Sequence, residues 1–202
     1  MKIYPTFKEE LFLMSQGHRL VAGVDEVGRG PLAGNVTAGA VILPTDFEWD
    51  EFSIYDSKKM TEAGREKIYE SVRSDDRISW STAYVPEKTI DEIGIYKATQ
   101  LAMLWAIEKL NPSPDFVIID GREFKNSLFD RFFKKFIVRA DEKILSCSLA
   151  SIMAKVTRDR YMVQMHKEYP EYGFDRHKGY GTKFHLDAIA RHGACPIHRM
   201  SF

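Results

Sequence analysis

The sequence predicts an α/β fold in which helices flank a mixed β-sheet. Two short apolar runs, at about residues 19–26 and 35–43, are separated by a glycine-rich bend and are too short for helices, so we interpret them as strands. Apolar residues recur near the helical period over residues 90–110. A continuous apolar run at 116–121 predicts a fully buried strand. Strands before a long helix, and then strands separated by helices, indicate a mixed sheet with helices packed on it.

The individual elements follow from the same patterns in chain order. We expect helices at about 5–17, 62–73, 90–110, 144–168 and 182–192, and strands at about 19–26, 35–43, 78–85, 116–121 and 136–139. Phe7 and Leu11 belong to the buried stripe predicted for the first helix, and Tyr96 and Trp105 to that of the long helix. Thr61 is placed to cap the helix that begins at residue 62.

Length and charge bound the class of protein. A chain of 202 residues suits one domain, covering residues 1–202, with a helical C-terminal part from about residue 144. The 29 basic and 29 acidic residues cancel, so the net charge gives no indication of a nucleic-acid partner. Residues 151–202 carry nine Lys or Arg against five Asp or Glu, a modest excess that a solvated helix face would also explain.

The cysteines and the apolar runs indicate a cytoplasmic protein. Two cysteines do not make a disulfide framework, and Cys147 lies in an apolar run typical of a core position. Cys195 and His198 have a ligand-like spacing but no second pair, which argues against a zinc site. Residues 1–20 contain several charged side chains and do not resemble a signal peptide. The longest apolar run is far too short to span a membrane.

Two adjacent acids, Asp25 and Glu26, close the first predicted strand just before the glycine-rich bend. A solvated turn pair is the ordinary explanation, but Val24 and Val27 flank the acids and place them near the core. Buried carboxylates need a partner, a metal ion or a raised pKa. Because side chains alternate along a strand, both acids reach one site only if the strand twists or ends there.

The glycines after this pair also invite a dinucleotide-binding interpretation. The spacing Gly28-x-Gly30-x-x-x-Gly34 differs from that fingerprint, and a β-rich segment rather than a helix follows it. Asp120 closes another apolar strand, which turn chemistry before Gly121 would equally explain. Ligands bind at strand ends in sheets of this kind, so Asp120 is a candidate to join the first pair of acids.

Several segments together resemble one family, ribonuclease HII. They are, in the family's order, GVDEVGRGPLAG (23–34), DSKK (56–59), IDG (119–121), ASIMAKVTRD (150–159), YGF (172–174), HKGYGT (177–182) and CPIHRMSF (195–202). The resemblance implies a ribonuclease H-like fold with a five-stranded mixed sheet. It also implies an endonuclease that cuts the RNA strand of RNA–DNA hybrids, and cuts 5′ of a single ribonucleotide embedded in duplex DNA, leaving 3′-hydroxyl and 5′-phosphate ends.

The resemblance implies four catalytic, metal-binding carboxylates, namely Asp25, Glu26, Asp120 and Asp141. Ala140 precedes Asp141 where the family more often has glycine, so Glu142 is the alternative ligand if the register differs by one residue. Carboxylates without Cys or His suit hard cations, and the expected cofactor is Mn²⁺ or Mg²⁺ in a two-metal mechanism. No organic cofactor is expected.

The family also implies a reader for the 2′-hydroxyl that separates RNA from DNA. By motif the reader is Gly28, Arg29 and Gly30, where glycine permits close approach to ribose, together with Tyr180, which packs on the following deoxyribose. Candidate phosphate contacts are Lys58, Lys155, Lys178 and Ser151, with Lys59 and Lys183 as further possibilities. The expected partners are RNA–DNA hybrids and ribonucleotide-containing duplex DNA, bound by a monomer with no membrane association.

Three alternatives stay open on the sequence. Ribonuclease HIII shares the chemistry but carries an N-terminal substrate-binding domain, whereas only about twenty residues precede the first motif here. A binding module that has lost catalysis is disfavoured by the presence of all four acids. A metal-dependent phosphatase or another nuclease is disfavoured by the ribose-reading segment and Tyr180.

Overall fold

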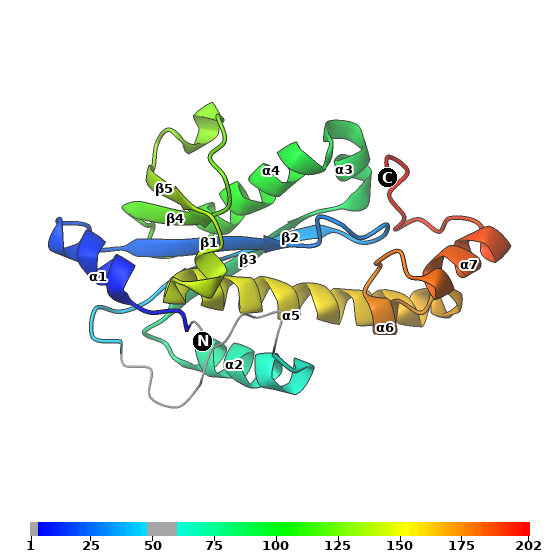
Figure 1. Cartoon of the computed structure of the whole chain (residues 1–202), viewed down its shortest axis with the longest axis horizontal. Helices are drawn as coiled ribbons and strands as arrows, with labels where there is room; N and C mark the ends of the chain where they lie inside the picture. Colours follow the sequence, from blue (N-terminus) through cyan, green and yellow to red (C-terminus); the bar gives the residue numbers. More distant parts are fainter. Residues whose placement is uncertain (1–3, 48–59) are drawn as a thin grey trace.

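A five-stranded mixed sheet forms the centre of the protein in a computed structural model that describes residues 4–47 and 60–202 (Figure 1). Its strands are β1 (Val21–Val27), β2 (Val36–Ile42), β3 (Ser79–Val85), β4 (Phe116–Asp120) and β5 (Phe133–Ile137). They lie in the order β3-β2-β1-β4-β5. The pairs β3–β2 and β2–β1 are antiparallel, and the pairs β1–β4 and β4–β5 are parallel. The predicted fold class is confirmed.

Helices cover both faces of the sheet (Figure 1). They are α1 (Lys8–Ser15), α2 (Glu62–Ser74), α3 (Glu87–Ile93), α4 (Ile95–Glu108), α5 (Leu145–Glu168), α6 (Phe174–His177) and α7 (Lys183–His192). Helices α3 and α4 lie on one face, α5 lies along the other with α2 packed beneath it, and α6 and α7 extend from the far end of α5. Across the described ranges, no helix has the length and apolar character needed to cross a bilayer.

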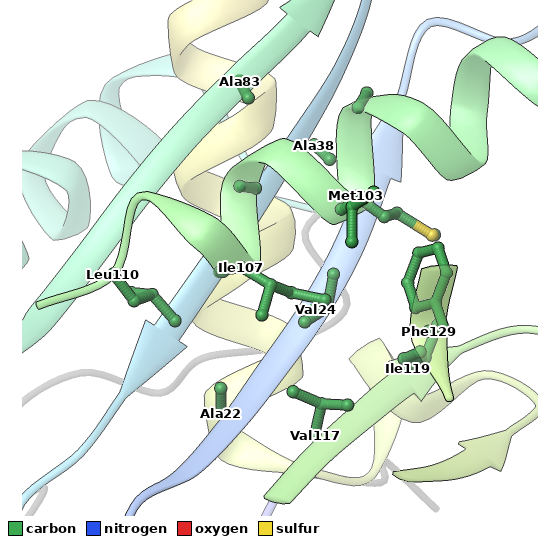
Figure 2. Packing of buried hydrophobic residues seen from close by; sticks show 14 of the residues in the cluster. Ala22, Val24, Ala38, Ala83, Met103, Ile107, Leu110, Val117, Ile119 and Phe129 are labelled. Carbon is green, nitrogen blue, oxygen red and sulfur yellow. The ribbon is translucent and has the colours of Figure 1, made fainter. Parts of the chain in front are cut away.

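The core between the sheet and α4 follows from strand alternation. Val24 of β1 and Val117 and Ile119 of β4 point to the same face and pack beneath Met103 and Ile107 of α4 (Figure 2). All five side chains are almost completely buried. This alternation also sets the direction of the next residue on each strand, so Asp25 and Asp120 point to the side of the sheet that α5 covers.

Helix α5 approaches the sheet unusually closely. A Cβ at Gly23 would lie 2.3 Å from the backbone nitrogen of Cys147, and one at Gly39 would lie 2.3 Å from the carbonyl oxygen of Ala150. Glycine at these two positions lets the helix backbone rest directly on β1 and β2. Cys147 is fully buried there, which confirms its predicted core position.

The structure corrects the prediction of one helix over residues 90–110. Gly94 adopts φ +80°, so α3 ends and α4 begins around it. The stripe predicted for this helix is also wrong in part, since Tyr96 and Trp105 are 56% and 37% exposed. The fifth strand occupies Phe133–Ile137, three residues before its predicted start.

The predicted buried stripe of the first helix is wrong as well. Leu11 is 48% exposed, whereas Glu10 and Leu13 are buried. Glu10 is drawn inward because its Oε1 accepts a hydrogen bond from the backbone nitrogen of Ser146 at 2.9 Å, in the first turn of α5. A carboxylate is favourable at a helix N-terminus, and no helical periodicity reveals such a tertiary cap. The predicted cap of α2 is confirmed, because the Thr61 side chain accepts from the backbone of Gly64.

Candidate active site

Three carboxylates from distant parts of the chain converge at one end of the sheet. Asp25, Asp120 and Asp141 each offer an oxygen atom within 4.8 Å of the others. The parallel register pairs Val24 with Ile119, so Asp25 and Asp120 lie side by side at the C-terminal ends of β1 and β4. The convergence expected for these acids is therefore observed.

Asp141 reaches the cluster through a tight turn after β5. Arg139 adopts a left-handed conformation with φ 57°, and the short 3₁₀ helix Ala140–Glu142 follows. The backbone nitrogen of Ala140 donates to Asp120 Oδ1 at 2.6 Å, which ties this turn to the end of β4. Asp141 is 1% exposed and joins the cluster, while the alternative ligand Glu142 lies 3.9 Å from the Arg139 guanidinium.

Glu26 lies on the opposite face of the sheet end from Asp25. Its backbone pairs with Ala38, a residue of the core beneath α4, and its side chain lines a groove of about 490 Å³ with Arg29 and Asp120. Arg29 Nη1 donates to Glu26 Oε1 at 3.2 Å. Strand alternation thus separates the two adjacent acids, and Glu26 lies outside the three-carboxylate cluster.

The carboxylate cluster concentrates negative charge in a buried place. Burial, and next to it the charges of Glu26, Asp120 and Asp141, raise the pKa of the Asp25 carboxyl well above its usual value. The Ser151 hydroxyl hydrogen bonds to Asp25 and opposes this shift. Ser151, predicted to contact phosphate, is therefore placed against an acid of the cluster. Oxygen ligands that repel one another fit a divalent cation, whose charge would remove the repulsion.

The turn between β1 and β2 is held by two buried arginines whose roles the sequence did not reveal. Arg158 of α5 donates to the carbonyls of Ala33 and Asn35, and Arg199 donates to those of Gly28, Arg29, Gly34 and Asn35. They are 0% and 3% exposed, and burial lowers both pKa values, that of Arg199 to about 10. In the sequence both residues look like surface arginines, because their hydrogen-bond acceptors are main-chain carbonyls, which no residue type identifies.

The predicted ribose-reading residues lie together on this turn. Gly28 is buried with φ +92°, whereas Arg29 and Gly30 are exposed. A Cβ at Gly30 would meet only Tyr180 Cε1, at 3.8 Å, so nothing within the protein requires glycine there. Tyr180 is 43% exposed beside it.

The lysines predicted to contact phosphate have partners of their own or lie elsewhere. Lys155 Nζ donates to Asp159 Oδ1 at 2.7 Å, one helical turn away. Lys178 Nζ donates to the carbonyl of Asp175. Lys58, with its neighbour Lys59, lies outside the described residues. Phosphate contact by any of these side chains stays a prediction.

A buried histidine pair lies behind Tyr180. His185 Nδ1 is 3.0 Å from the carbonyl oxygen of Tyr180, and His185 Nε2 is 3.0 Å from His198 Nε2. The backbone nitrogen of Cys195 donates to His198 Nδ1 at 2.8 Å. His198 Nδ1 also lies 3.2 Å from the carbonyl oxygen of Cys195, a longer contact than that with the nitrogen. With Nδ1 accepting from the Cys195 nitrogen, His198 Nε2–H donates to His185 Nε2, and His185 Nδ1–H donates to Tyr180. Both rings are therefore neutral, and burial lowers both pKa values, that of His185 to about 4.

Comparison with known proteins decides the family. A sequence profile described as Ribonuclease HII matches residues 22–202. The chain belongs to the ribonuclease HII family. The ribonuclease HII of Acetivibrio thermocellus is 49% identical over 187 residues, covering 93% of this chain and 71% of that protein. The ribonuclease HII of Caldicellulosiruptor bescii is 46% identical over 196 residues, covering 97% and 92%.

A solved structure agrees with this assignment. The ribonuclease H2 of Pyrococcus horikoshii OT3 superimposes with a TM-score of 0.71 at 27% identity, covering 91% of this chain and 93% of that one. The fold is therefore ribonuclease H-like. The protein is a type 2 ribonuclease H, an endonuclease that acts on the RNA of RNA–DNA hybrids, and the residues that match the family include each acid of the buried cluster.

Asp25→Asn tests whether the carboxylate cluster binds metal. At pH 8 without metal, we expect the variant to melt about 2–4 °C higher than the wild type, because one repelling charge is gone. Addition of Mn²⁺ should raise the melting temperature of the wild type but not that of the variant, since a ligand stabilises only a fold that binds it. Thermal unfolding followed by circular dichroism measures both effects.

Glu142→Gln is the matched control, since Glu142 neighbours Asp141 in the chain but lies outside the cluster. The control should respond to Mn²⁺ as the wild type does. An equal response to Mn²⁺ in wild type and Asp25→Asn would exclude Asp25 as a ligand.

The buried histidine pair predicts acid sensitivity of the fold. The pKa of His185 is about 4 in the folded protein and near 6.5 in the unfolded chain, so between these values only the unfolded chain binds the proton. The free energy of unfolding should therefore fall by about 2 kcal/mol from pH 7 to pH 5 on account of this side chain. His185→Asn should flatten the pH dependence, and the exposed His192→Gln should not. Urea titrations at the two pH values decide, and an unaltered slope in His185→Asn would contradict the assignment.

Proposed function

We propose that this ribonuclease HII cleaves 5′ of a single ribonucleotide embedded in duplex DNA, as well as within longer RNA–DNA hybrids. The observation that carries the proposal is an exposed Gly30, open to a ligand, that lies beside Tyr180 and follows three residues after β1, the strand that bears Asp25. One ribose at this turn would be read while its 5′-phosphate lies near the acids. The products would be a 3′-hydroxyl and a 5′-phosphate.

In the proposal Asp25, Asp120 and Asp141 hold divalent metal, with Glu26 as the fourth ligand. Glu26 would have to turn from Arg29, a partner whose side chain is 53% exposed and is therefore weakly held. Two Mg²⁺ or Mn²⁺ ions, when bound, supply an activated water and a counter-charge for the leaving oxygen. The protein itself contributes the fixed spacing of the acids and the Ser151 hydroxyl that orients Asp25.

In the proposal, ribose recognition requires that the sugar comes close to the main chain of residues 28–30. An exposed glycine with an ordinary φ is not required by local backbone geometry, so a close-fitting ligand is a physical reason for Gly30. Backbone groups of Gly28 to Gly30 would contact the 2′-hydroxyl, and Tyr180 would pack on the following deoxyribose. Arg29, freed from Glu26, would face the substrate backbone together with the lysines named above.

The proposal takes the chain as one catalytic domain, monomeric, cytoplasmic and without organic cofactor. Both cysteines are free thiols, and Cys147 is buried in the core, which agrees with a reducing compartment.

The experiment compares a duplex DNA carrying one ribonucleotide with the same duplex made entirely of DNA. With Mn²⁺ or Mg²⁺ we expect a single cut 5′ of the ribonucleotide, no cut in the control, and no activity in EDTA. Mapping of the ends by gel electrophoresis and phosphatase sensitivity identifies the products. Equal cutting of both duplexes would indicate an unspecific nuclease. Cleavage of longer hybrids alone would contradict the proposed single-ribonucleotide activity.

Gly30→Ala separates recognition from folding. Its Cβ would make only an ordinary van der Waals contact with Tyr180, so we expect an unchanged melting temperature. The ratio kcat/KM on the single-ribonucleotide duplex should fall about 10- to 100-fold, because a misplacement of about 1 Å is enough for such a loss. Gly28→Ala is the contrasting variant: its Cβ would lie 2.3 Å from Arg158 Nε, so its melting temperature should fall. Full activity in Gly30→Ala would remove Gly30 from the ribose reader.

A further inference from the structure

We infer that the dipeptide His198-Arg199 is a positioning element that fixes the two halves of the ribose reader, the turn at residues 28–30 and Tyr180, relative to each other. The inference rests on the proposed function, because it assigns a role within the same recognition site. Neither residue touches the carboxylate cluster, and neither reaches the exposed face of the turn, since they are 6% and 3% exposed.

Arg199 holds the first half. Its Nη2 donates to the carbonyl of Gly28 at 2.6 Å and to that of Asn35 at 3.0 Å. Its Nη1 donates to the carbonyl of Arg29 at 3.1 Å, and its Nε to that of Gly34 at 2.8 Å. One planar guanidinium thus joins the start and the end of the turn. An ammonium group cannot reproduce this fork of donors, so lysine is not an equivalent residue here.

His198 holds the second half through His185. The tautomers deduced above form a directed chain, in which His198 Nε2–H donates to His185 and His185 Nδ1–H donates to the carbonyl of Tyr180. The Tyr180 main chain makes two further bonds: its nitrogen donates to the carbonyl of His177 at 3.0 Å, and its carbonyl also accepts from the nitrogen of Thr182 at 2.8 Å. Among the described side chains, that of His185 is the one that bonds to this carbonyl. The carbonyl contact fixes the residue whose ring would pack on the sugar.

The main chain of the dipeptide connects the two halves. The backbone nitrogen of Arg199 donates to the carbonyl of Leu32 at 2.8 Å, and that of Gly34 donates to the carbonyl of Ile197 at 2.9 Å. These bonds surround an antiparallel bridge between Ala33 and His198. Consecutive Cα atoms are about 3.8 Å apart, so one peptide unit fixes the spacing of the points from which the two side chains start.

Arg158 differs from Arg199 in what it reaches. It donates to the carbonyls of Ala33, Asn35 and Lys178, which form the base of the turn and the residue before Gly179. Arg199 alone among the described side chains bonds to the carbonyls of both Gly28 and Arg29. A loss of Arg199 would therefore release the residues nearest the ribose while the base of the turn remains held.

Steady-state kinetics on the full chain with Mn²⁺ tests the inference. The substrate is a duplex DNA with one ribonucleotide, and the all-DNA duplex serves as a competitive inhibitor. For Arg199→Lys and His198→Phe we expect KM to rise about tenfold, since a net hydrogen bond to the ribose is lost, while the inhibition constant of the all-DNA duplex stays unchanged. His198→Gln should restore most of the wild-type KM, because its side-chain amide can donate to His185.

The controls are Arg160→Lys, an exposed arginine of α5 that pairs with Glu66 and Glu70, and His192→Gln on α7. Neither should alter KM. A purely structural effect would lower the active fraction, and hence kcat, with KM and the inhibition constant unchanged. That pattern, or a parallel rise of KM and the inhibition constant, would overturn the inference. If Arg199→Lys does not fold, the comparison of His198→Phe with His198→Gln decides alone.

The activity of the wild-type chain distinguishes failure of the proposed function from failure of the inference. A wild-type chain that does not cut at the single ribonucleotide overturns the proposed function, and the inference falls with it. A wild type that cuts selectively beside an Arg199→Lys variant of unchanged KM overturns the inference alone.

Discussion

The parallel pairing of β1 with β4 is the constraint on which the rest of the structure depends. It sets Asp25 next to Asp120, and alternation turns both toward α5, while Val24 and Ile119, which precede them, face α4. The glycines that let α5 rest on the sheet then place Ser151 against Asp25. A shift of one residue in this register would send one acid into the apolar core, where an unpaired charge is very costly. The core and the site are thus specified by the same pairing.

Charge is distributed in two separate buried groups around the β1–β2 turn. On one side the carboxylates repel one another, a repulsion that the dication of the proposed function would remove. On the other side Arg158 and Arg199 are neutralised mainly by carbonyl dipoles, with the buried Glu87 as a nearby opposite charge. Carbonyls as partners leave the arginine charges directed at the main chain of the turn. The turn is therefore stiff without any contribution from its own exposed side chains.

Much of this architecture was predictable, and the exceptions have physical causes. Strand runs and the acids that end them follow from local patterns, which is why Asp25 and Asp120 were found from apolar periodicity and Asp141 only from the family motif. Gly94 divided a helix that its apolar period alone made continuous. The buried roles of Glu10 and Arg199 were not predicted, because their partners are backbone groups 136 and 164–171 residues away in the chain. Tertiary capping of this kind leaves no periodic signature in a sequence.

The long separation between Arg199 and the turn that it holds has a consequence for biosynthesis. Residues 28–35 leave the ribosome some 165 residues before the guanidinium that fastens them. A nascent chain can therefore pair its strands and bring its clustered acids together while the turn still lacks the hydrogen bonds from Arg199. In the proposed function, the part of the site that would recognise a ribose is therefore completed last, after residue 199 has been synthesised. Incomplete translation products that end between residues 141 and 199 would accordingly contain Asp25, Asp120 and Asp141 but lack the guanidinium that bonds to Gly28 and Arg29.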